Sequence, residues 1–259
     1  MRITFFLVTL FIILLADSCR RKLPEQPPTD PCKDKTSFKA GFTIEEIVGD
    51  TSFVTDKALA PGYVFFRAQG TYDSVQWFIG GPQNTSANRN HVLYFQNPEG
   101  PVDVTFIGYR KPDTQCFPND KATDTVHKTV TILPRNESAA IVGRFHGYNE
   151  SNPADTFSVT ISYYDNVWGY FIKNLPKGCP GYTTGSESNP RNIGLVIAAG
   201  YSGFRIDAGA VACSMVKGIG KISNTDSITI NYTYIPVLST NPHTYDKARS
   251  AKFIGIRKP

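Results

Sequence analysis

Histidine is scarce in this chain of 259 residues, with only four copies, and they form no HExxH motif that would indicate a zinc protease. No two cysteines stand at CxxC spacing, which argues against a zinc ribbon or a thioredoxin-like redox site. There is no GxSxG nucleophile elbow and no P-loop. The stretch Gly218-Ile219-Gly220 lacks the third glycine of a dinucleotide-binding loop. We therefore expect neither an enzyme nor a bound cofactor.

The apolar run at the N-terminus, residues 3–15, is shorter than the roughly 20 residues that span a bilayer. It has the length of a secretory h-region and follows one positive charge, Arg2. Ala16 and Ser18 are small residues at the third and first positions before Cys19. We expect residues 1–18 to be a signal peptide that is cleaved before Cys19.

Residues 14–19, Leu-Leu-Ala-Asp-Ser-Cys, resemble the lipobox of bacterial lipoproteins. The resemblance implies that Cys19 carries lipid and anchors the chain in the cell envelope, at either face of the outer membrane. Plain secretion is the alternative. The Pro-rich residues 19–36 then read as an extended tether.

The chain contains five cysteines, so four remain for disulfide bonds if Cys19 is lipidated. An even number of cysteines suits an oxidising compartment, because all of them can then be paired. The four disulfide candidates are Cys32, Cys116, Cys179 and Cys213. Sequence alone allows three pairings of four cysteines. By their order along the chain we expect the first two to pair with each other, and likewise the last two.

The rest of the composition favours an all-β chain. Aromatic residues make up 12% of the sequence, and short segments alternate apolar with polar residues, as strands with one buried face do. We predict a first β-domain at 37–134 and a second at 138–259. The net charge of +5 is too small and too dispersed to predict a nucleic-acid partner.

The first domain contains segments that resemble PKD domains, a family of immunoglobulin-like sandwiches. Residues 72–81 carry Trp77 as the family's third strand does, and residues 100–106 and 125–133 are similar to its later strands. The resemblance implies an antiparallel β-sandwich that serves as a spacer or binding module without catalysis. The expected strands are 38–44, 63–68, 74–79, 92–95, 102–109 and 126–133.

The second domain contains eight candidate strands, which predict either a closed antiparallel barrel or another sandwich. These are 140–145, 156–163, 168–173, 195–201, 204–208, 216–222, 227–234 and 252–256. Residues 143–147, 157–161 and 218–220 resemble the lipocalin-like domains of bacterial surface lipoproteins. A barrel of this size either holds one small ligand or is filled by its own side chains.

Aromatic residues around the Asp165-Asn166 turn are candidates for ligand binding: Tyr163, Tyr164, Trp168 and Tyr170. If exposed, they would form a platform for a glycan or a partner protein. The alternative, which we favour, is that they belong to the core of a hairpin.

Acidic residues around Cys116 are candidates for a calcium site: Asp113, Asp120 and Asp124. Asp-rich loops also form simply because Asp suits turns. Carboxylates such as Glu45, Glu46, Asp155 and Asp165 could act in pairs, but no motif identifies a pair.

We therefore expect a non-enzymatic, membrane-anchored envelope lipoprotein that binds a glycan or an envelope protein. One alternative is a polysaccharide-acting hydrolase or its accessory protein, which would need two carboxylates about 5–9.5 Å apart across a cleft. Another is a purely structural component of a surface assembly.

Overall fold

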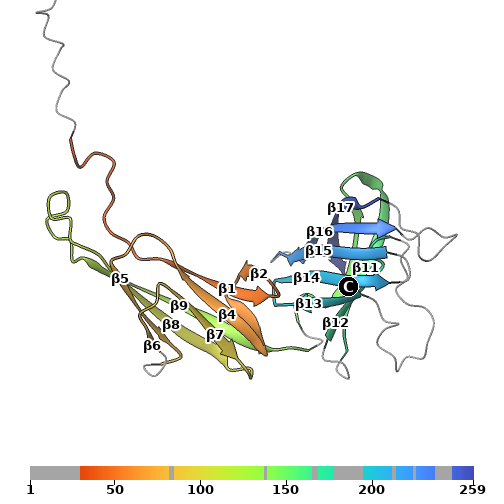
Figure 1. The fold of residues 1–259 in the computed structure, drawn as a ribbon, viewed down its shortest axis with the longest axis horizontal. Helices are drawn as coiled ribbons and strands as arrows, with labels where there is room; N and C mark the ends of the chain where they lie inside the picture. The colour runs from red at the N-terminus through yellow and green to blue at the C-terminus, as the bar shows by residue number, and fades with distance from the viewer. Residues whose placement is uncertain are drawn as a thin grey trace, which may run out of the picture. The chain divides into compact units, whose positions relative to one another are not determined.

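The computed structural model describes residues 30–81, 85–136, 139–164, 169–177, 195–211, 214–223, 226–236 and 247–259 (Figure 1). The secondary-structure elements within these ranges are all β-strands. None of the described residues form a helix that could cross a membrane. The predicted signal peptide, Cys19, Trp168, Cys179 and Cys213 lie outside the described residues. Residues 38–111 and 121–259 form one compact unit, and residues 30–37 and 112–120 belong to another.

Two sheets form the first part of the large unit. One has the order β2-β1-β4-β7, with β1 Phe42–Val48, β2 Thr51–Val54, β4 Gly62–Ala68 and β7 Asn90–Phe95. The other has the order β3-β9-β8-β5-β6, with β3 Lys57–Ala60, β5 Ser74–Ile79, β6 Thr85–Ser86, β8 Gly100–Tyr109 and β9 Thr123–Pro134. All neighbours are antiparallel except β3 and β9, which pair in parallel. The predicted antiparallel sandwich is therefore present, with one parallel pair at the edge of its second sheet.

The two sheets enclose one apolar core, in which alternate residues of each strand point inward. Trp77 on β5 is fully buried, and its ring centroid lies 5.2 Å from that of Phe42 and 4.4 Å from that of Phe106. Its indole nitrogen donates a hydrogen bond to the carbonyl of Asn88 at 2.8 Å. The fold is therefore a β-sandwich of the immunoglobulin-like kind, with the expected tryptophan at its centre.

A closed barrel of eight antiparallel strands follows. Its strands are β10 Gly143–Asn149, β11 Asn152–Tyr164, β12 Gly169–Lys173, β13 Leu195–Ala199, β14 Gly203–Val211, β15 Ser214–Ile222, β16 Ser227–Pro236 and β17 Arg249–Lys258. Each strand pairs with the next, and β10 pairs with β17 to close the ring. Of the two predicted architectures for this region, the structure has the barrel.

Large side chains occupy the interior of the barrel. Phe145, Phe157, Tyr170, Phe204 and Phe253 are all buried there. Gly220 on β15 makes room for one of them, since a Cβ at that position would lie 2.1 Å from the nearest ring atom of Phe204. In the part of the barrel that the structure describes, the interior is thus filled by side chains, one of the two alternatives for a barrel of eight strands.

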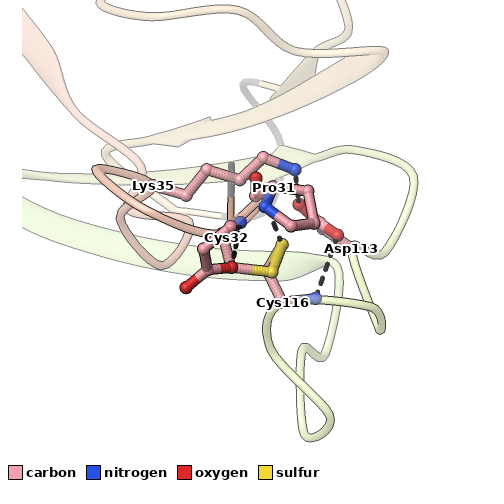
Figure 2. The surroundings of a disulfide bond; sticks show 6 residues. Pro31, Cys32, Lys35, Asp113 and Cys116 are labelled. Carbon is pink, nitrogen blue, oxygen red and sulfur yellow. Dashed lines mark hydrogen bonds and ion pairs between the residues drawn. A yellow bond between two sulfur atoms is a disulfide. The ribbon is translucent and has the colours of Figure 1, made fainter. Parts of the chain in front are cut away.

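Cys32 and Cys116 form a disulfide within the small unit, which confirms the first of the two predicted pairs (Figure 2). Lys35 pairs with Asp113 at 3.1 Å beside it. Asp113 also accepts a hydrogen bond from the backbone nitrogen of Cys116 at 3.3 Å. The disulfide therefore joins the segment that precedes β1 to the loop that follows β8.

Candidate functional site

Of the four aromatic residues considered as a ligand platform around the Asp165-Asn166 turn, three lie on described parts of β11 and β12. Tyr170 is fully buried in the barrel, its hydroxyl donates to the carbonyl of Asn136 at 3.1 Å, and burial raises its pKa to about 12. Tyr163 is partly buried against the same core, with its ring centroid 5.0 Å from that of Tyr170. Tyr164 packs edge-on against Phe171. Tyr170 is thus a core residue, because its strand turns that side chain inward.

The three aspartates considered as calcium ligands all make contacts within the protein. Asp113 pairs with Lys35, and Asp120 accepts a hydrogen bond from the backbone nitrogen of Asp113 at 3.0 Å. Asp124 accepts one from the backbone nitrogen of Ala40 at 2.7 Å. Among the described residues, no three His, Cys, Asp or Glu side chains are grouped so that they could hold a metal ion.

The carboxylates considered for hydrolysis are not arranged as a catalytic pair in the described residues. Glu45 and Glu46 are neighbours on β1, so their side chains point to opposite faces of the sheet. Asp155 pairs with Lys177 on the surface, and Asp165 lies outside the described residues.

The sandwich carries an exposed aromatic surface on the outer face of the sheet β2-β1-β4-β7. Tyr63 on β4 and Tyr94 on β7 stand directly opposite each other, with ring centroids 4.8 Å apart. They are 51% and 52% exposed. We call this surface the tyrosine face and define it by Ile47, Val54, Tyr63, Phe65, Val92 and Tyr94.

The strand pairing places these side chains next to one another. Phe65 stands opposite Glu45 on one side and Val92 on the other, and Tyr63 likewise stands between Ile47 and Tyr94. Residues directly opposite on one face of a sheet have Cβ atoms about 5 Å apart and touch. The apolar side chains therefore form a continuous surface across three strands.

An ion pair lies within the tyrosine face. Arg67 donates to both carboxylate oxygens of Glu45, at 2.9 and 3.2 Å, and Ser52 and Thr43 donate to the same group at 2.7 and 3.0 Å. The bond from Arg67 is the main cause of a lowered pKa at Glu45. The Arg67 guanidinium also lies 4.5 Å from the centroid of Phe65. Glu45 is thus paired and hydrogen-bonded, and this pairing holds the Arg67 guanidinium beside the aromatic surface.

Glu46 lies on the other side of β1, where the sandwich meets the barrel. Its side chain is buried, and its two oxygens accept hydrogen bonds from the backbone nitrogens of Leu59 at 2.6 Å and Tyr201 at 2.5 Å. Burial raises its pKa to about 7, although both hydrogen bonds and the charge of Arg135 act in the opposite direction. One buried carboxyl thus links β3 to the turn between β13 and β14.

Close packing and ion pairs complete this junction. Phe53 on β2 is buried against Gly203, where a Cβ would lie 2.2 Å from its ring. Arg205 on β14 pairs with Asp50 in the turn after β1. Arg135, after the last sandwich strand, donates to the carbonyl of Ala199 at 2.7 Å. The junction is therefore both apolar and hydrogen-bonded.

One short run in the sequence does indicate the tyrosine face. Residues 63–66 read Tyr-Val-Phe-Phe, so both faces of that strand carry apolar side chains. The side chains on one face fill the core of the sandwich. Those on the other face must either be covered by a partner or be exposed to solvent. Nothing in the sequence pairs Tyr63 with Tyr94, which lies 31 positions further along, since that contact follows from the sheet order.

Comparison of the chain with protein-family models, with curated proteins and with solved structures finds no match in any of the three.

Proposed function

We propose that the chain is a non-enzymatic, lipid-anchored protein of the bacterial cell envelope that holds a partner protein on its tyrosine face. The observation that carries the proposal is the exposed pair Tyr63 and Tyr94 on a sheet face. Exposed apolar surface costs free energy in water, so a contiguous patch of it marks an interaction site. The sandwich, which resembles PKD domains, would act as the binding module.

The composition of the tyrosine face favours a protein as its partner. Tyr and Arg are among the side chains that contribute most at protein interfaces, because they offer a large contact area together with a polar group. Tyr63, Tyr94 and Arg67 supply these, and Arg67 is already ordered by Glu45. Ordering a side chain before association reduces the entropy that binding costs.

The first test places a photoreactive amino acid at position 47 of the full-length chain in living cells. We expect cross-linking to one envelope protein, and we expect the pair of changes Tyr63→Ser and Tyr94→Ser to weaken its binding at least about tenfold, because two aromatic anchors are lost. Tyr109→Ser is the matched control, since Tyr109 is a partly exposed tyrosine on the other sheet.

Equal capture by the double variant and the wild type would contradict a protein partner at this face. A cross-linked product that glycosidases remove and proteases do not would identify a glycan there instead.

The anchor is tested separately through Cys19. We expect Cys19→Ser to move the chain from the membrane fraction to the soluble fraction, because a lipidated N-terminus is the proposed attachment. Globomycin, which blocks the lipoprotein signal peptidase, should cause the unprocessed precursor to accumulate. Unchanged processing and fractionation under both treatments would leave plain secretion as the export route.

A further inference from the structure

The outer surface of the barrel carries a hollow of about 970 Å³. Its floor lies on strands β14 to β17, which are neighbours in the barrel (Figure 1). Asp50 in the turn after β1 and Thr51 at the start of β2 line it together with Glu150 and Ser151 of the turn between β10 and β11. We call this hollow the barrel trough. Its volume falls within the range of about 300–1,000 Å³ that small-ligand sites occupy, and such sites often lie where two domains meet.

The floor of the barrel trough is a row of outward-facing side chains. Arg205 stands opposite Ile219, Ile219 opposite Asn231, and Asn231 opposite Lys252. Ile219 is 40% exposed, and Asn231 beside it is exposed as well. The row thus combines one apolar contact with an amide group that both donates and accepts hydrogen bonds.

The charged side chains around this floor compensate one another. Arg205 pairs with Asp50 and, at 3.3 Å, with Asp207, which also lies 3.9 Å from Lys217. Lys252 pairs with Glu150 at 2.6 Å. An anionic ligand would have to compete with the carboxylates for the cations, and a cationic ligand would have to compete with the cations for the carboxylates. A neutral ligand with many hydroxyl groups could accept from the cations and donate to the carboxylates without separating them.

We infer that the barrel trough binds a neutral oligosaccharide. The hydroxyl groups of the sugar would bond to the Asn231 amide and to the ion pairs of Arg205 and Lys252 at the two ends of the row, and an apolar face of one sugar ring would cover Ile219. The inference is independent of the partner protein proposed for the tyrosine face, because the two surfaces have no residue in common.

Calorimetric titration of the full-length chain in mild detergent tests the inference. The probes are two neutral trisaccharides, N,N′,N″-triacetylchitotriose and maltotriose, and one acidic trisaccharide, trigalacturonate. We expect at least one neutral probe to bind, and trigalacturonate to bind at least about tenfold more weakly. Asn231→Leu should weaken binding of the neutral probe by a similar factor, because it removes the amide and leaves the strand exposed as before.

Two control variants locate the binding. Thr160→Leu makes a similar polar-to-apolar change on the outer side of β11, outside the trough, and should bind the sugar as the wild type does. Tyr63→Ser should also leave sugar binding unchanged. The inference would be overturned by no heat from either neutral probe at about 10 mM, by tighter binding of trigalacturonate, or by full binding to Asn231→Leu. Loss of sugar binding in Tyr63→Ser would also overturn it and would move the glycan to the tyrosine face.

Discussion

The free energy of unfolding is expected to fall by about 3 kcal/mol as the pH rises from below 4.5 to above 7, through the buried carboxyl of Glu46. Burial raises its pKa in the folded state from 4.5 to about 7. Between these two values the folded chain holds a proton that the unfolded chain has released. The stabilisation is thus complete below 4.5 and is lost as the pH rises through about 7.

The groups that face Glu46 come from both sides of the junction. The backbone nitrogens of Leu59 and Tyr201 donate to its carboxylate, and the positive charge of Arg135 also favours the ionised form. Lys57 lies beyond Tyr201, and its ammonium donates to the Tyr201 hydroxyl at 3.3 Å. Glu45 titrates in a different window: its lowered pKa gives a stabilisation that is lost only below 4.5.

Urea unfolding of the full-length chain at about pH 5 and about pH 8 measures this dependence. In Glu46→Gln the difference between the two pH values should largely disappear, because an amide does not titrate. Glu45→Gln is the matched control on the neighbouring position and should retain the difference. An unchanged pH dependence in Glu46→Gln would assign the effect to other groups.

Loss of the Phe53 ring should lower the free energy of unfolding by about 3–5 kcal/mol, the usual cost of Phe→Ala at a buried position. Phe53 is 2% exposed and packs where sandwich and barrel meet. Its ring occupies the space that a side chain on Gly203 would need. Phe53→Ala should therefore leave a cavity at the junction, and this cavity is the reason for the lower free energy of unfolding.

A double-mutant cycle separates this packing from a general loss of stability. Gly203→Ala alone should cost about 1–3 kcal/mol, because its Cβ meets the Phe53 ring. In the Phe53→Ala background the same change should cost less by at least about 1 kcal/mol, since the ring is gone. Gly41→Ala is the control, because its Cβ would have its nearest neighbour at 3.9 Å. Strictly additive costs would show that the two positions do not touch.

The sequence predicted the elements whose side chains follow a regular period. All eight barrel strands were expected, since segments such as 156–163 alternate between core and surface over many residues. Strands β2, β3 and β6 were missed, because two to four residues are too few to show a period. The first strand was expected at 38–44 but runs from 42 to 48, since two adjacent glutamates do not indicate a buried strand.

The candidate sites depend on contacts between residues far apart in the sequence. Glu46 is buried because it meets Tyr201, which lies 155 positions later. Tyr170 was considered for a surface platform, but the closure of the barrel turns it inward. Composition identifies aromatic residues, and only the sheet order decides which of them face solvent.

The disulfide between Cys32 and Cys116 also determines how mechanical load would travel along the chain. The two cysteines are 84 positions apart, and strands β1 to β8 lie between them in the sequence. Tension applied between the N-terminal segment and the C-terminus passes from Cys32 directly to Cys116 and continues toward β9. Residues 33–115 are then a closed covalent loop that bears no direct pull. A protein held at its N-terminus could thus be stretched without its tyrosine face lying on the path of the force.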